Sequence, residues 1–171
     1  LGSLALADLS ADESVKLIRE TKKLTDKPFA VNIFAHDIPV ITEDLKQKFI
    51  ATKIFLEKLG RENNIEVSLP ELEDIKVNGY HEQIDVLIEE GCNILSFTFG
   101  NLDDKSIQKL KENGVILMGT CTSVKEALIL ENSGIDVICV QGTEAGGHRG
   151  TFDPDHVLQI GGLSLLAQVY D

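Results

Sequence analysis

The sequence predicts an α/β protein with a parallel sheet of the (β/α)8 TIM-barrel type, present as an incomplete barrel of about five βα units. Three observations support this prediction. Short apolar runs alternate with helix-like stretches along the chain. Gly91, Gly114 and Gly134 each precede an apolar run, where helix-to-strand turns are expected. Polar or glycine-rich residues follow the apolar runs, and this is the end of a barrel that gathers active sites.

The elements follow in order from local signals. Asp8 to Ser10 offer caps for a first helix, and Pro28 separates that helix from the run FAVNIF. Gly91 and Gly114 end later helices. We expect strands at residues 1–6, 29–34, 93–99, 115–118 and 135–140, and helices at 11–24, 42–60, 80–90, 103–113 and 123–132.

Residues 1–171 are expected to form a single domain, with residues 62–79 as an irregular insertion at the rim, because that stretch is polar and contains Pro70 and Gly79. A flavodoxin-like open sheet is the alternative fold. Its ligand loops would gather at one switch point, whereas here polar residues recur after several strands.

Composition limits the possible partners. The formal net charge of -12 disfavours nucleic acid and anionic membrane surfaces, and no apolar run approaches the ~18 residues of a membrane span. Three scattered cysteines suggest neither a disulfide framework nor a zinc site, so a cytoplasmic location is expected. Cys139 is expected to pack within a strand. Cys121 is expected near a strand end, where it could line the pocket, but nothing near it in the sequence would lower its pKa.

The loop QGTEAGGHRG, residues 141–150, carries the main chemical signal. Its glycines allow positive φ and let backbone amides approach a flat ring or a phosphate. His148 lies among them, and imidazole can take a proton near neutral pH. A tight turn with an exposed histidine is an equally good explanation from the residues alone. His36, His81 and His156 are expected at the surface.

Two amides stand at or near strand ends. Asn32 and Gln141 can each donate and accept hydrogen bonds along the edge of a heteroaromatic ring. Each can also be an interior amide with its partners satisfied. Because they belong to two different strands, a shared pocket is the better explanation.

The stretches DVICVQGTEAGGHRG, LTDKPFAVNIF, ILSFTFG and GTCTSVKEA together resemble the nitronate monooxygenase family, formerly called 2-nitropropane dioxygenases. The resemblance covers essentially the whole chain. It implies an FMN-dependent barrel enzyme that oxidatively denitrifies alkyl nitronates or nitroalkanes with O2, giving a carbonyl compound and nitrite. It also implies that His148 is the catalytic base and that Asn32, Gln141, Gly146 and Gly147 contact FMN, with no metal ligands.

The chain also departs from that family. The resemblance implies an earlier strand and two later ones, whose loops hold the FMN phosphate, and none of these is found in the sequence. Two alternatives therefore stay open. One is a flavin-dependent NAD(P)H enoyl-acyl-carrier-protein reductase of the same superfamily, and the other is a truncated, inactive barrel that acts only in binding. A homo-oligomer is possible in each case.

Overall fold

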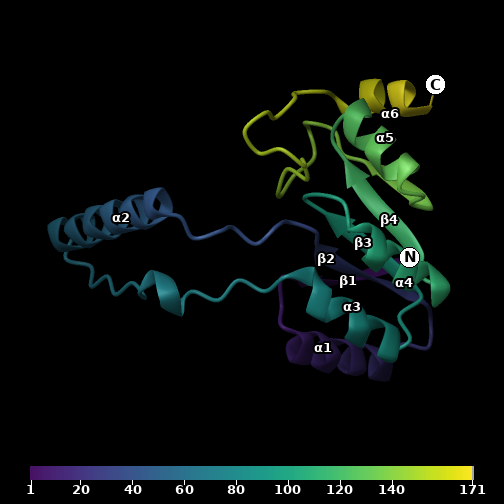
Figure 1. Cartoon of the computed structure of the whole chain (residues 1–171), viewed down its shortest axis with the longest axis horizontal. Coiled ribbons are helices and arrows are strands. Elements are labelled where there is room, and N and C mark those ends of the chain that lie inside the picture. The colour runs from purple at the N-terminus through teal and green to yellow at the C-terminus, as the bar shows by residue number, and fades with distance from the viewer. Residues whose placement is uncertain (171) are drawn as a thin grey trace. The chain divides into compact units, whose positions relative to one another are not determined.

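The computed structural model of the chain describes residues 1–170. The chain divides into two compact units (Figure 1). The first unit comprises Leu1–Asp37 together with the chain from Asn78 onward, and the second comprises Ile38–Val77. All five strands belong to the first unit, so the strand-end residues singled out by the sequence lie there.

The sheet of the first unit is wholly parallel, and its strands lie in chain order. The strands are β1 (Gly2–Ala7), β2 (Phe29–Phe34), β3 (Ile94–Thr98), β4 (Ile116–Cys121) and β5 (Val137–Val140). Sequential order without a reversal is that of a (β/α) barrel, whereas a flavodoxin-like sheet has a switch point. The predicted fold class is confirmed, as are the five strands to within a few residues.

A helix follows most strands of the first unit. These helices are α1 (Ala11–Leu24), α3 (Tyr80–Glu89), α4 (Asp104–Glu112), α5 (Val124–Asn132) and α6 (Gly162–Tyr170). Four of them match the predicted ranges closely. No element was predicted at α6.

The two faces of the sheet differ in burial. Along β3, Leu95 and Phe97 are fully buried, while Ser96 between them is only half-buried. Leu95 and Phe97 belong to one core cluster with buried helix residues such as Ile18 and Leu130. Because side chains alternate along a strand, Asn32, which pairs in register with Ser96, lies on the opposite face. Helices therefore cover one face and leave polar side chains on the other.

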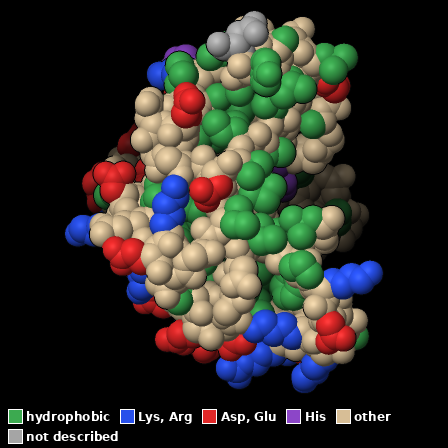
Figure 2. Space-filling model, turned by 90° about the vertical axis from the view of Figure 1, so that its right-hand side faces the viewer, with side chains coloured by type: hydrophobic (Ala, Val, Ile, Leu, Met, Phe, Trp, Pro, Cys, Tyr) green, Lys and Arg blue, Asp and Glu red, His purple; other side chains and the backbone are tan. Residues whose placement is uncertain are grey.

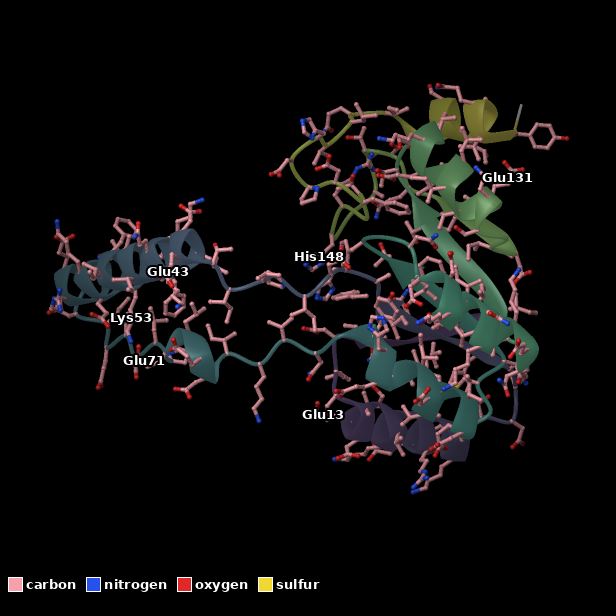
Figure 3. The ribbon with its side chains drawn as sticks, viewed as in Figure 1. Glu13, Glu43, Lys53, Glu71, Glu131 and His148 are labelled. Carbon is pink, nitrogen blue, oxygen red and sulfur yellow. The ribbon has the colours of Figure 1, made fainter. Side chains whose placement is uncertain are left out.

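The second unit consists of the long helix α2 (Glu43–Glu62) and the short helix η1 (Leu72–Asp74), joined by extended chain. Thr42 caps α2 by accepting a hydrogen bond from Leu45 N at 3.2 Å. Lys53 pairs with Glu71 at 2.6 Å, and this hydrogen bond raises the pKa of Lys53 (Figure 3). Of residues 62–79, expected as an irregular insertion, the part up to residue 77 lies in this unit.

Hydrophobic side chains remain at the surface of the first unit. Figure 2 shows them gathered in a band on the face turned to the viewer. The large exposed apolar residues of α5, β5 and α6 are Leu128, Ile129, Val137, Leu163, Leu166 and Tyr170. Within residues 1–170, none of the helices has both the length and the apolar character needed to cross a membrane.

Candidate active site

His148 lies beside the carboxyl ends of β2 and β3 (Figure 3). Its ring centroid is 5.8 Å from that of Phe99, which directly follows β3, and 6.5 Å from that of Phe34, the last residue of β2. The two phenyl rings also meet edge to face at 4.7 Å. Within residues 1–170, the imidazole forms no hydrogen bond, so both ring nitrogens are available to a ligand.

Gln141 holds the loop that carries His148. Its side-chain amide donates from Nε2 to the backbone oxygen of His148 at 2.9 Å and accepts at Oε1 from the backbone N–H of Gly150 at 2.8 Å. Both ends of the amide are therefore used within the loop. Gln141 was predicted to contact FMN, but its side chain instead binds the backbone of the two residues that flank Arg149.

Two charged side chains of the loop also bind backbone. Arg149 donates to the carbonyl oxygens of Gln141 at 2.8 Å and Leu158 at 3.0 Å. Glu144 accepts from the backbone N–H of Gly162, the first residue of α6, at 2.9 Å. Hydrogen bonds from its own backbone N–H and from Gly162 lower the pKa of Glu144. The loop is thus tied to Leu158 and to the start of α6 as well as to itself.

The glycines of the loop serve different purposes. A Cβ on Gly150 would lie 2.5 Å from Thr98 Oγ1, and one on Gly142 would lie 2.3 Å from Gly162 N, so neither position has room for a side chain. Gly147 has φ of +78°, which favours glycine. Gly146 has neither constraint, because nothing lies within 4 Å of its Cβ position. The chain itself gives no reason for glycine at 146, whereas a ligand lying against the backbone there would.

Asn32 lies on the face of the sheet that the helices leave uncovered. Its Nδ2 donates to Ser96 Oγ at 2.9 Å, and Ser96 in turn donates to the carbonyl of Val31 at 3.3 Å. No hydrogen bond to Asn32 Oδ1 forms within residues 1–170. One edge of this amide is fixed by the neighbouring strand, and the other is free to accept from a ligand.

The backbone after β3 is strained next to His148. Phe99 has φ of +69°, which is rare for a bulky residue. Gly100 follows with φ of +151°, and a Cβ there would lie 2.6 Å from the carbonyl oxygen of Ala35. This close approach turns the chain so that Phe99 reaches the imidazole of His148.

A cavity of about 650 Å³ opens beside this turn, lined by residues that follow β2, β3 and β5. Phe99 and Phe152 contribute aromatic surface. Two of its lining residues, Asn101 and Arg149, each have a buried polar atom without a hydrogen-bond partner, Oδ1 and Nε respectively. A further cavity of about 670 Å³ borders α3 and α4, but it shares no lining residue with this one.

Some residues differ from their predicted environments. Cys121 is fully buried, and burial followed by the nearby charge of Glu126 raises the pKa of its thiol to about 11. Cys139, expected to pack, is exposed. His36, expected at the surface, is half-buried and lines the 650 Å³ cavity, whereas His81 and His156 are exposed as predicted. The roles of Phe34, Phe99 and Arg149 have no clear signal in the sequence.

Across the described part of the chain, no three His, Cys, Asp or Glu side chains gather closely enough to hold a metal ion. The chemistry available is the exposed imidazole of His148, which lies against Phe34 and Phe99, the amide oxygen of Asn32, and open backbone at Gly146. The sequentially ordered parallel sheet and these strand-end residues are those of a (β/α)-barrel protein, a fold whose sites lie at the carboxyl ends of the strands.

Comparison with known proteins identifies the family. The family model for nitronate monooxygenase matches residues 1–171, so the chain belongs to the nitronate monooxygenase family. It is 36% identical to a probable nitronate monooxygenase of Staphylococcus saprophyticus, covering 100% of this chain and 48% of the relative. It is 38% identical to a nitronate monooxygenase of Paraburkholderia phytofirmans, covering 91% of this chain and 42% of that one.

Solved structures agree with the fold. The crystal structure of nitroalkane oxidase from Streptomyces ansochromogenes matches with a TM-score of 0.82 and 32% identity, over 99% of this chain and 48% of that one. FabK from Thermotoga maritima matches with a TM-score of 0.58 and 24% identity, over 94% of this chain and 36% of that one, which shows the fold alone. The chain spans about half the length of the curated relatives it matches.

Proposed function

We propose that the protein uses FMN and O2 to convert alkyl nitronates and nitroalkanes into carbonyl compounds and nitrite. Family membership supports the class of reaction. The observation that carries the proposal is the placement of His148, whose unpartnered imidazole lies against Phe34 and Phe99 beside the strand ends.

The residues around His148 suit the edge of a flavin ring. Gly146 and Gly147 offer backbone without side chains, and Asn32 offers a free amide oxygen on the uncovered face of the sheet. We assign these three residues to FMN binding, and we assign Gln141 to holding the loop. FMN, when bound, supplies the electron transfer to O2, while the protein supplies orientation and electrostatics.

His148 acts as the general base for neutral nitroalkanes. Its imidazole takes the proton from the carbon that bears the nitro group, a contribution of roughly 10² to 10⁴ in rate. A nitronate already lacks that proton, so it needs this step less. His148 does not line the 650 Å³ cavity, but its ring contacts Phe99, which does. The aromatic walls of that cavity, Phe99 and Phe152, suit the apolar substituent of the substrate.

The test compares His148→Asn with the wild type in the holoenzyme. We expect nitrite release from a nitroalkane to fall by about 10² to 10⁴-fold, with less effect on the matching nitronate and with visible flavin absorbance retained. His156→Asn, a change at an exposed histidine whose ring is bonded to Asp153, is the control. Unchanged nitroalkane turnover in His148→Asn would remove the base role.

The same preparation separates the rival functions. Anaerobic oxidation of NADPH that depends on an enoyl thioester would replace the proposed reaction with that of an enoyl reductase. A purified protein without flavin absorbance, and with no absorbance gained on adding FMN, would instead favour a barrel that acts only in binding.

A further inference from the structure

Glu126 is a buried carboxylate with no charged partner. It lies in the first turn of α5 and only 7% of its surface is exposed. It forms no salt bridge within residues 1–170. Such a group is costly to bury unless hydrogen bonds satisfy it, so its partners indicate what it does.

Four donors meet this carboxylate. One oxygen, Oε2, accepts from the backbone N–H and the hydroxyl of Thr122, at 2.5 and 2.8 Å. The other, Oε1, accepts from the hydroxyl of Thr151 at 3.0 Å and from the backbone N–H of Phe152 at 2.9 Å. Thr122 follows β4, whereas Thr151 and Phe152 come directly after the loop of His148. The carboxylate therefore joins two separate strand-end segments.

The geometry requires a group that only accepts hydrogen bonds. Each oxygen faces one backbone N–H, from Thr122 on one side and Phe152 on the other, and a backbone N–H cannot become an acceptor. A glutamine here would direct its NH2 at one of these two N–H groups in either orientation. Glu126→Gln is therefore nearly isosteric but disrupts the cluster.

We propose that Glu126 is the positioning residue that fixes the far end of the His148 loop. Gln141 holds the near end, binding His148 O and Gly150 N, and Glu126 holds Thr151 and Phe152. The side chain of His148 forms no hydrogen bond in the described chain. Its position therefore depends on the backbone of the loop, which Gln141 and Glu126 hold. Phe152 also lines the 650 Å³ cavity, so the same anchor shapes that wall.

Amide hydrogen exchange of the 171-residue chain tests this anchor without flavin or substrate. In Glu126→Gln, we expect exchange at residues 143–152 to rise by about tenfold to a hundredfold, because the backbone N–H of Phe152 loses its acceptor and this end of the loop is released. Amides of β2 and β3 should change much less. Glu131→Gln is the matched control on the same helix, since its side chain is exposed and Figure 3 shows it well away from His148.

Two results would overturn the proposal. One is exchange at residues 143–152 that is the same in Glu126→Gln as in Glu131→Gln. The other is an increase spread evenly over the sheet and the loop, which would make Glu126 a general stability residue. If Glu126→Gln does not fold, Thr151→Val decides, because it removes one hydroxyl donor and keeps the carboxylate. The proposal then requires faster exchange confined to the loop.

The consequence for catalysis rests on the proposed function and has its own readout. In the holoenzyme, Glu126→Gln should lower kcat for a nitroalkane by about tenfold while flavin content stays at the wild-type level. A change in loop exchange without a change in kcat would keep the anchor and remove its catalytic role. Inactive wild-type holoenzyme would count against the proposed function and leave the exchange result standing.

Discussion

Helices α1 and α5 begin with the same sequence pattern, Ser-x-x-Glu, and use it differently. In both, the serine is the N-cap and its hydroxyl accepts from the backbone N–H of the glutamate three residues on, Glu13 at 3.4 Å and Glu126 at 3.2 Å. In α1, the Glu13 carboxylate returns to Ser10, accepting from its N–H at 3.1 Å and its hydroxyl at 2.6 Å. In α5, the carboxylate leaves the cap and binds Thr122 and the His148 loop.

The difference lies in the surroundings of each carboxylate. Glu13 is at the surface (Figure 3), and the Ser10 hydroxyl followed by the Ser10 backbone N–H lowers its pKa. Glu126 is buried among donors that belong to other segments. A capping pattern therefore predicts the start of a helix reliably, while the role of its acidic residue depends on tertiary contacts.

The largest difference is expected on removing the two carboxylates. Glu126→Ala leaves two backbone N–H groups, of Thr122 and Phe152, and the Thr122 hydroxyl without their acceptor, while the Thr151 hydroxyl keeps only the Asp153 carbonyl oxygen at 3.3 Å. This should lower the free energy of unfolding by about 3 kcal/mol. Glu13→Ala should have a much smaller effect, because water replaces an exposed acceptor. Urea unfolding of the chain measures both. Equal losses would contradict the distinction between cap and anchor.

The next largest effect is expected at two glycines of the His148 loop, Gly150 and Gly146. Gly150→Ala places a methyl group 2.5 Å from Thr98 Oγ1, so the loop must lift, at a cost of about 1–3 kcal/mol. Gly146→Ala meets no atom within 4 Å and should leave unfolding unchanged while weakening FMN binding. Urea unfolding and flavin titration separate the two. A stability loss in Gly146→Ala would mean that the fold, not a ligand, requires that glycine.

The smallest difference is expected between the two serine caps. Ser10→Ala and Ser123→Ala each remove one hydroxyl acceptor from a first turn, and each should cost about 1 kcal/mol. Similar losses would show that the helix starts are equivalent and that only the glutamates differ. A loss several times larger for Ser123→Ala would indicate that the α5 cap is itself part of the anchor.

Local patterns predicted most of the fold. The apolar runs and glycine turns placed the five strands and most helices, because each signal lies inside its own element. Helix α6 was missed, since its first N–H is capped by Glu144, which lies 18 residues earlier. The buried Cys121 and exposed Cys139 were assigned to the wrong environments because the sequence does not show which face of the sheet the helices cover.

Only part of the candidate site has a signal in the sequence. The loop and His148 stand out in the sequence, since glycines and an imidazole after an apolar run are unusual together. The turn at Phe99, with its positive φ, depends on the close approach of Gly100 to Ala35 and has no local signal. Glu126 resembles an ordinary capping residue in sequence, so its contact with Thr151 and Phe152 could be found only in three dimensions.

The way the His148 loop is anchored limits its use in protein engineering. Residues 141–152 copied alone into another barrel would lack the acceptor that Glu126 provides for Thr151 and Phe152, and the short Thr98 side chain that Gly150 packs against. A working graft therefore needs a recipient with a carboxylate placed like Glu126 and a short side chain placed like Thr98. The unit that can be transferred is the loop together with the residues that hold it. A recipient scaffold should be chosen first for having those residues.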